Sequence, residues 1–320
     1  MIWLKVVMAA VMSGALSSAI GFVLPPRSPQ PFVLQLSDWP GDRLFTLIEP
    51  LELAPSKRLV PLDIRVASPG QDGVDAFKAG RVDAALVGVE RLPELLADEV
   101  RLIWVSDEVI GGGALVAAPG VMRVADLGSR PVGIGFGGAG EPLLRALLGR
   151  AGLDAARVTL TPLVPEAAGA ALKSGAVGAA ALLSPARAES LRDALGATLL
   201  ASTRDLSGVS THVLVVKEGM IADRREQLVA VLHALSRTVR TCRSAPERCL
   251  DLLAASTARP AAAWRGELET IRFLDAADNR ALLEGGNTAP LTKRFTAPPP
   301  RPAMDWIDPS LAIDAGRLGE

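Results

Sequence analysis

The chain has 320 residues, which is room for about two domains of ordinary size, and it can bury a sizeable core without help. Its 34 Lys and Arg residues balance 35 Asp and Glu residues, giving a net charge of -1. Because the basic residues are also scattered along the sequence, nucleic acid and anionic lipid surfaces are not expected as partners.

The N-terminus carries an export signal. Lys5 is followed by an uncharged apolar run from Val6 to Leu24 and then by two prolines, so residues 1–26 are typical of a signal peptide or an N-terminal membrane anchor. A small-residue site ending at Ala19 would suit cleavage, and the same run is long enough to remain as an anchor. We expect export to the periplasm, with cleavage favoured over retention.

Strands and helices alternate through the first two thirds of the chain. A strand is expected at 32–36, followed by the loop SDWPGD and a helix over 44–53, and the remainder after the strand at 212–216 is mainly helical. The stretch TAPPPRP at 296–302 opens a C-terminal strap, residues 296–320. The other expected elements are strands at 62–67, 82–88, 100–105, 113–118 and 131–136, and a helix over 141–152.

An internal repeat divides the chain. The segment AFKAGRVDAALVG at 76–88 returns at 171–183 as ALKSGAVGAAALL, and the expected strand at 62–67 has a counterpart at 157–162. Each copy has the pattern strand, loop, helix, glycine turn, strand, which is a βαβ unit. Two α/β lobes that share this unit favour a cleft closing on a ligand over a single catalytic core.

The two cysteines, Cys242 and Cys249, favour a disulfide in an exported protein. The apolar series before Cys242 predicts a helix that ends near it, and Pro246 is typical of the first turn of the next helix. A bridge would hold this corner together; two free thiols packed in a helical layer are the alternative. A metal site needs more ligands than this neighbourhood has.

Gly133, Gly135 and Gly138 have G-x-G-x-x-G spacing between a strand and a helix, the context of a dinucleotide-binding loop. The acidic partners that such a site requires are poorly placed, since Asp154 falls in a loop and Glu166 lies beyond the second strand. We therefore expect no cofactor. The loop can instead hold a polar or anionic ligand group on backbone N–H groups at a helix N-terminus, or serve only as a tight turn.

Catalytic and metal-binding constellations are absent from the sequence. The two histidines are far apart: His212 begins a strand, and His233 is expected to be solvated, facing away from the apolar stripe of its helix. No G-x-S-x-G elbow and no clustered Cys and His spacing occur. The chain is therefore not expected to be an enzyme.

The loop after the first strand is the best candidate for ligand contact. Trp39 follows Asp38 in a Pro-Gly turn, which holds an aromatic ring near the carboxyl end of a strand, where α/β sheets bind ligands. The competing interpretation is a Trp39 that packs only as a lid on its own lobe.

Several sequence blocks of the chain resemble one family, the substrate-binding proteins of ABC importers for sulfonates, taurine, nitrate and thiamine-precursor pyrimidines. The resemblance covers nearly all of the chain beyond the signal and depends on the order of several blocks. These blocks are DWPG (38–41), AFKAGRVDAA (76–85), DEVIGGGALVA (107–117), VADLGSRPVGI (124–134), ALKSGAV (171–177) and STRDLSGVSTHVLVV (202–216).

The resemblance implies a two-lobed periplasmic-binding-protein type II fold, with two hinge crossings and a ligand cleft between the lobes. The crossings would fall near 116–119 and 211–214. Lobe one would combine 32–117 with 213–310, and lobe two would be 118–212. The implied ligand-binding residues are Asp38, Trp39, Gly88, Val89, Gly113, Gly137, Gly138, Ala139, Glu141, Ser184 and His212.

Two departures from the family pattern bear on the ligand. Gly113 and His212 stand where the family tends to have Asp, so a cleft with fewer carboxylates would disfavour amines and accept an anionic or neutral ligand. His212 could also make affinity vary between about pH 5.5 and 7.5.

The resemblance further implies partners: a small-molecule ligand and an ABC permease in the inner membrane, with the chain itself a monomer. One alternative is a membrane-tethered sensory module that keeps Val6 to Leu24 as an anchor and acts through a partner protein. Another is an enzyme of the related pyrimidine-synthesis branch, which would need a His- and Cys-based metal centre that the sequence does not offer.

Overall fold

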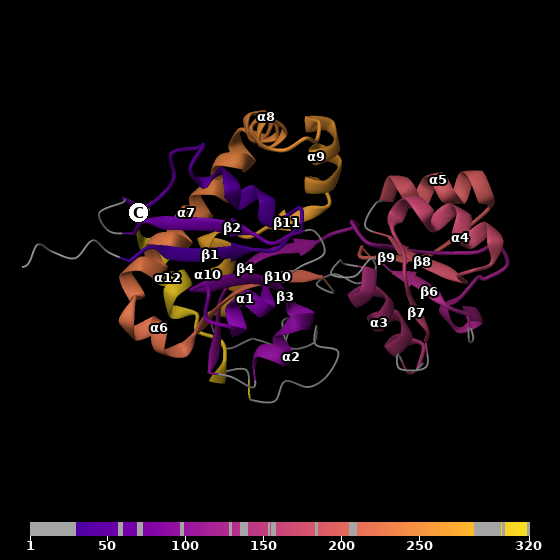
Figure 1. Cartoon of the computed structure of the whole chain (residues 1–320), viewed down its shortest axis with the longest axis horizontal. Coiled ribbons are helices and arrows are strands. Elements are labelled where there is room, and N and C mark those ends of the chain that lie inside the picture. The colour runs from indigo at the N-terminus through magenta and orange to yellow at the C-terminus, as the bar shows by residue number, and fades with distance from the viewer. Residues whose placement is uncertain are drawn as a thin grey trace, which may run out of the picture.

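The computed structural model describes two sheets and the helices that cover them (Figure 1). It places the chain over residues 30–56, 60–68, 73–96, 99–127, 130–134, 140–152, 154, 158–182, 185–204, 210–284, 302 and 305–318. Residues 1–26, with the predicted signal or anchor, lie outside this part. In the part that is described, no helix is long and apolar enough to cross a membrane.

Lobe one is built on a six-stranded sheet of order β11-β4-β10-β3-β1-β2. Strands β1, β2 and β3 are parallel to one another, and β10 lies between β3 and β4 and is antiparallel to both. The near-continuous apolar runs of β1, β3 and β10 suit strands that are covered on both faces. The bounds are β1 Phe32–Leu36, β2 Leu62–Val66, β3 Ala84–Gly88, β4 Val100–Val109, β10 Thr211–Lys217 and β11 Ile271–Phe273.

Helices cover both faces of this sheet and share one large apolar core. The longest, α7 (Arg225–Ser244), buries a stripe that includes Leu228, Leu232 and Leu235 against η1 and α12. The others are η1 Asp42–Ile48, α1 Val74–Lys78, η2 Val89–Arg91, α2 Leu92–Leu95, α6 Glu218–Asp223, α8 Pro246–Ser256, α9 Ala261–Leu268, α10 Ala276–Leu283 and α12 Ser310–Arg317.

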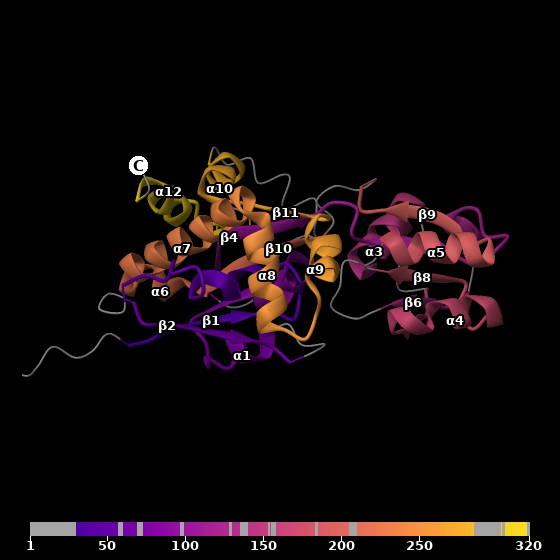
Figure 2. The ribbon, with the colours of Figure 1, turned by 90° about the horizontal axis from the view of Figure 1, so that it is seen from above.

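Lobe two is built on a five-stranded sheet of order β7-β6-β8-β5-β9, with a separate apolar cluster on each face. Its strands are β5 Ala114–Ala117, β6 Val132–Ile134, β7 Leu160–Pro162, β8 Ala179–Leu182 and β9 Thr198–Ser202. Its helices are η3 Val124–Leu127, α3 Gly140–Arg150, η5 Pro165–Ala167, α4 Ala168–Ser174 and α5 Pro185–Leu195. The lobes lie side by side in both views (Figures 1 and 2).

The sequence repeat is confirmed as a repeat of structure. The first copy forms β2, α1 and β3, and the second forms β7, α4 and β8. In each lobe these two strands flank an earlier one, since β1 lies between β2 and β3 and β6 lies between β7 and β8. The equivalence extends one strand further, because the next strand in each sheet is antiparallel, β10 beside β3 and β5 beside β8.

Each of these antiparallel strands follows a segment that crosses between the lobes. The chain leaves lobe one after β4 and enters lobe two as β5, so the first crossing lies at 110–113 rather than near 116–119. It returns between β9 and β10, just before the expected 211–214. The strand at 114–117 therefore belongs to the lobe-two sheet, because its edges pair with β8 and β9.

Three local predictions differ from the structure. The helix expected over 44–53 is the 3-10 helix η1, which ends at Ile48 and is followed by turns. The expected C-terminal strap contains α12, because Leu311, Ala312 and Ala315 form an apolar stripe that packs on α7 and α10. That helix also half-buries His233, whose Nδ1 lies 3.0 Å from the Ala315 carbonyl, so this histidine is not fully solvated.

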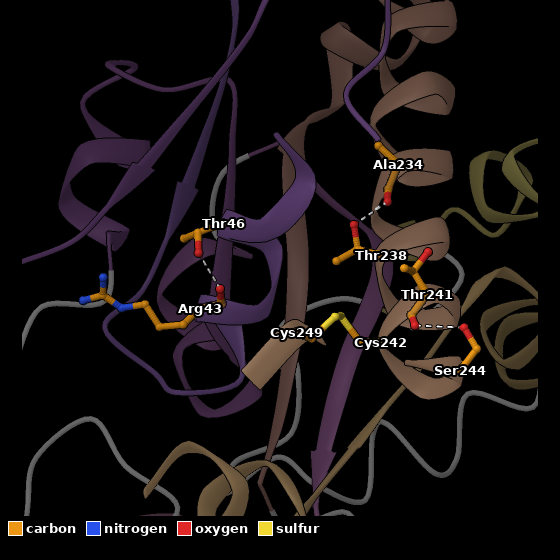
Figure 3. The surroundings of a disulfide bond; sticks show 8 residues. All are labelled: Arg43, Thr46, Ala234, Thr238, Thr241, Cys242, Ser244 and Cys249. Atoms are coloured by element: carbon orange, nitrogen blue, oxygen red, sulfur yellow. Dashed lines mark hydrogen bonds between the residues drawn. A yellow bond between two sulfur atoms is a disulfide. The ribbon is translucent and has the colours of Figure 1, made fainter. Parts of the chain in front are cut away.

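The predicted disulfide is present. Cys242, near the end of α7, is bonded to Cys249 in α8, and the pair lies beside η1 (Figure 3). The bridge joins two helices across a short corner, as the spacing predicted.

Candidate ligand-binding site

The centre of the candidate site is a ring stack beside the second crossing. The Trp39 indole, in the loop after β1, lies on the His212 imidazole, in β10, with ring centroids 5.0 Å apart and planes 13° apart. Trp39 is 7% exposed and His212 is 5% exposed. Two residues that the sequence analysis selected separately are therefore in direct contact.

Local hydrogen bonds and one glycine hold the Trp39 loop in place. The Trp39 backbone N–H donates to Ser37 Oγ at 3.1 Å. A Cβ at position 41 would lie 2.5 Å from Trp39 Nε1, so only glycine at this position lets the indole take this pose. Trp39 also packs in one apolar cluster with Val109 and Ile271.

Asp107 is the cross-strand neighbour of His212, because the adjacent strands β4 and β10 pair these two residues in register. Asp107 Oδ1 lies 3.3 Å from His212 Nδ1, and the carboxylate is fully buried. The Ser106 hydroxyl lies 3.1 Å from Asp107 Oδ2 and equally far from the His212 carbonyl, so its single proton can be donated to either acceptor.

The imidazole is held in its charged form. Burial alone would lower the pKa of His212, but the charge and hydrogen bond of Asp107, with smaller contributions from Asp42 and Glu90, raise it to about 9. His212 is thus an imidazolium at neutral pH. The ligand affinity is therefore not expected to change between about pH 5.5 and 7.5 through His212, since this histidine titrates at alkaline pH.

Asp42 is the second buried carboxylate of the cluster. Its Oδ2 accepts the Ser37 N–H at 2.8 Å and the Ser37 hydroxyl at 2.7 Å. Burial raises its pKa to about 6, opposed by the charge of His212 and assisted by that of Asp107. The cluster therefore brings three acidic side chains, Asp107, Asp42 and Glu90, around one imidazole.

Two buried polar atoms of this cluster have no hydrogen-bond partner among the described residues. They are the donor Trp39 Nε1 and the acceptor Asp42 Oδ1. A buried polar group without a partner costs about 1–3 kcal/mol. Because the stacked arrangement carries this cost, less free energy is needed to move the indole off His212. A polar ligand group that hydrogen-bonds to Trp39 Nε1 or Asp42 Oδ1 would remove the cost.

Gly88 ends β3 next to His212, with which it is in register. A Cβ at position 88 would lie within 2.6 Å of the Glu90 carboxylate, so glycine allows Glu90 to fold back toward the strand end. Val89 is fully buried in the apolar core and presents no side chain to a ligand.

Gly113 belongs to the first crossing and ties it to the second. The Thr203 hydroxyl accepts the N–H of Gly111 at 2.6 Å and that of Gly113 at 3.2 Å. The Thr203 N–H in turn donates to the Gly113 carbonyl at 2.8 Å. Thr203 is fully buried, so the two crossings meet at one hydrogen-bonded point.

The remaining predicted residues are not part of this cluster. The Asp38 carboxylate pairs with Arg43 at 2.7 Å, on the partly exposed side of the loop. Gly137, Gly138, Ala139 and Ser184 lie outside the described residues, and only the backbone of Glu141 is described, in α3. Among the residues that the structure does place, no group of three metal-ligating side chains occurs.

Four acidic and hydroxyl residues of the cluster were not predicted from the sequence: Asp42, Glu90, Ser106 and Asp107. A signal was available for Asp107, because a charged residue that continues the apolar run of a central strand must be paired when it is buried. For Asp42 the signal was its position in the first turn of a helix, where an acidic side chain is favoured and can accept from the preceding loop, here from Ser37. The expectation of few carboxylates is wrong for the lobe-one side of the site, where Asp107, Asp42 and Glu90 lie near His212.

The glycine motif has a packing role at its first position. A Cβ at Gly133, in β6, would lie 2.3 Å from the Leu163 side chain, so glycine lets the segment after β7 pack against the strand. Gly135 and Gly138 lie outside the described residues.

Comparison with known proteins agrees with this architecture. The chain is similar to "Putative binding protein BMEII0109" of Brucella melitensis, with 23% identity over 194 residues, and the match spans 60% of each protein. The periplasmic aliphatic sulphonate binding protein SsuA from Escherichia coli has a similar structure, with a TM-score of 0.60, 21% identity and coverage of 79% of this chain and 89% of SsuA.

Two further solved structures share the fold. The ligand-binding component of an ABC-type import system from Staphylococcus aureus, solved with zinc bound, gives a TM-score of 0.65 at 15% identity, covering 90% of this chain and 99% of that one. The desulfurization enzyme DSZB gives 0.56 at 17% identity, covering 90% and 100%.

These likenesses establish the two-lobed periplasmic-binding-protein fold that the sequence predicted. The sequence model of the NMT1-like family matches residues 57–254, which is more than half of the chain and includes the whole of lobe two. The chain is a member of the NMT1-like family.

Proposed function

We propose that this protein is an extracytoplasmic solute-binding protein of an ABC importer. It captures a small ligand between its lobes, closes about the two crossings, and delivers the ligand to a permease in the inner membrane. The observation that carries the proposal is the Trp39–His212 stack beside a paired crossing, at the end of the lobe-one strands where α/β sheets bind ligands. A monomer in the periplasm is part of the same proposal.

The two crossings support a hinge. Hinges are short segments that absorb backbone rotation while packed lobes move as bodies. Here Gly111, with φ at 84°, and Gly113 give the first crossing backbone freedom, and Thr203 links it to the second. Each lobe keeps its own apolar core, so neither core needs to change on closure.

The charges around His212 bear on the ligand. Asp42 and Asp107 outweigh a single imidazolium there, so an anionic ligand group in contact with this side would be repelled. We propose a neutral polar or aromatic group at the Trp39–His212 stack. An anionic group, as in sulfonates or nitrate, would then be held from lobe two, by backbone N–H groups of Gly137, Gly138, Ala139 and Glu141 and by the Ser184 hydroxyl.

Binding is favoured over catalysis by the protonation of the cluster, although DSZB shows that an enzyme can use this fold. A general base must be unprotonated near neutral pH, so His212, held as an imidazolium, does not serve as one, and Asp42, with a pKa of about 6, is buried and accepts twice from Ser37. The hydroxyls of Ser37 and Ser106 have carboxylate acceptors rather than the imidazole. Both cysteines are joined in the disulfide, which leaves no thiol nucleophile.

The N-terminal segment decides between a free and a tethered protein. A free periplasmic receptor requires cleavage after about residue 19, and a tethered module retains Val6 to Leu24. N-terminal sequencing of the exported protein separates the two forms.

A thermal-shift screen tests the proposed function. The panel contains alkanesulfonates, taurine, nitrate, pyrimidines and aromatic carboxylates. A ligand at 100 times its Kd stabilises the folded state by about 2.7 kcal/mol, a shift of several degrees. We expect a hit in one chemical class that is lost in Trp39→Ala and kept in Trp306→Phe, a buried tryptophan whose carbonyl accepts from Leu102 near the start of β4, at the opposite end of that strand from the first crossing. Hits that survive Trp39→Ala would place the ligand elsewhere.

A further inference from the structure

A hollow lies on lobe one where η1, α7, α8, α9 and β11 meet. Its volume is about 190 Å³, and the Cys242–Cys249 disulfide of Figure 3 is part of its lining. None of the residues placed in the cluster around His212 lines it. The hollow is therefore a separate feature of lobe one.

The deepest part of the hollow is apolar. Four side chains that are each at most 4% exposed form its floor: Leu44, Val239, Cys249 and Leu250. The half-buried Leu268 and Phe273 add apolar walls. An engineered apolar cavity of about 150 Å³ in another protein stays dry and binds benzene, so this hollow is large enough for one aromatic ring.

The charged side chains at the rim already have partners. Arg243 donates to two carboxylates and to a backbone carbonyl of β11. Arg265 pairs with Glu247 at 2.5 Å, and the charge of the lining carboxylate Glu269 also acts on this guanidinium. An ionic ligand group would have to displace these pairs and lose its own hydration, whereas a neutral ligand leaves them in place.

The lining also favours a ring over an aliphatic chain. Phe273 can pair edge to face with a second ring, an arrangement that adds to the gain from apolar burial. Sulfur is polarizable and makes favourable contacts with ring edges, and both sulfur-bearing residues of the disulfide line the hollow.

A thin wall separates the hollow from the candidate site. Leu268 and Phe273 line the hollow and also pack against the apolar cluster of Trp39, Val109 and Ile271. The hollow is thus behind the Trp39 loop and opens at the charged rim, where Glu269 is exposed.

We propose that this hollow is a second binding site, for a small neutral molecule with one aromatic ring. The ring would fill the apolar floor and lie against Phe273 and the disulfide, and the charge pairs of the rim would stay formed. The site does not depend on the proposed transport function, because no residue of the cluster around His212 takes part in it.

The first arm of the test uses the unmodified exported protein, labelled in its Leu and Val methyl groups and titrated with toluene in NMR. We expect saturable binding with a Kd of about 1 mM or below. The largest shifts should fall on Leu44, Val239, Leu250 and Leu268. Shifts that do not saturate, or that are largest away from these four residues, would overturn the proposal.

The second arm fills the hollow. Leu268→Trp places an indole against the apolar floor, and we expect toluene to bind at least about tenfold more weakly. The matched control is Leu252→Trp in α8, a half-buried leucine that packs on the same core and does not line the hollow. This control should change the affinity less than about twofold. Equal weakening in the two variants, at unchanged melting temperatures, would contradict the assigned position; if either variant does not fold, the NMR titration decides.

The third arm tests the chemical class with charged analogues of the same ring. Benzoate carries a negative charge and benzylamine a positive charge at neutral pH, and each should bind at least about tenfold more weakly than toluene, because burial would strip its charge of water. Tighter binding of either analogue would show that the hollow recognises an ion and would refute the proposal of a neutral ligand.

Discussion

At the scale of single residues, the site depends on one contact that a methyl group would prevent. Gly41 has φ of −62° and ψ of −41°, which any residue can adopt, so its role is space rather than backbone freedom. The space holds the Trp39 indole against His212. A substitution at position 41 therefore tests the stack without changing either ring.

Gly41→Ala should expel the indole from the stack. We expect the Trp39 contribution to the fluorescence, measured as the difference from Trp39→Phe, to shift to the red and to become accessible to acrylamide. Stability should fall by about 2 kcal/mol, from lost burial and lost ring contact. The control is Gly266→Ala in α9, where a Cβ meets no atom within 4 Å and the helix should gain up to about 1 kcal/mol. An unshifted Trp39 emission in Gly41→Ala would contradict this account of the stack.

The charge on His212 predicts how stability depends on pH. Its folded pKa is raised from 6.5 to about 9, so the stabilisation is complete below pH 6.5 and is lost as the pH rises through 9. The loss is on the order of 3 kcal/mol relative to His212→Gln. Asp42 acts in the same direction between about pH 4 and 6, since burial favours its protonated form.

Urea unfolding of the protein and of His212→Gln across pH 6 to 10 measures this dependence. The difference between the two free energies of unfolding should shrink between about pH 6.5 and pH 9 and stay level above pH 9. A difference that stays constant with pH would show that His212 is not held as an imidazolium by Asp107.

At the scale of the elements, the crossings are joined by one hydroxyl. Thr203→Val keeps the shape of the side chain but leaves the N–H groups of Gly111 and Gly113 without an acceptor, each at a cost of about 1–3 kcal/mol. We expect lower stability and faster hydrogen exchange at these two amides. Thr203→Ser retains the hydroxyl and should keep slow exchange; equal protection in both variants would remove Thr203 from the hinge.

The corner between α7 and α8 is stabilised by its disulfide. Replacing both Cys242 and Cys249 by serine should lower the free energy of unfolding by about 2–3 kcal/mol, from the entropy of the opened loop. Adding a reductant to the unmodified protein should give the same loss in urea unfolding. A reductant effect on the double serine variant would point to another cause.

The elements were largely predictable from the sequence, because local patterns determine them. Strands such as β1 and β10 follow mainly apolar runs, and the helix boundary between Cys242 and Pro246 follows from the proline in the first turn of α8. The position of the first crossing was not predictable, because 114–117 is equally apolar in either sheet. Only pairing with β8 and β9, remote in sequence, places it in lobe two.

The site was predictable only in part for the same reason. Trp39 and His212 are conspicuous as single residues, but their contact depends on β10 returning from lobe two to lie beside β3. Asp107 reaches His212 through strand register, which sequence alone does not specify. The charge of the site, and hence its pH range, is therefore a property of the tertiary fold.

At the scale of the whole molecule, the central claim is that the two lobes close on a small ligand. The repeat gives each lobe its own sheet and core, so the lobes can move as bodies about the two crossings. Small-angle X-ray scattering, recorded with and without the tightest binder from the thermal-shift screen, measures this closure. We predict a smaller radius of gyration with the ligand and no change in Trp39→Ala, and an unchanged radius in the fully liganded protein would contradict the claim.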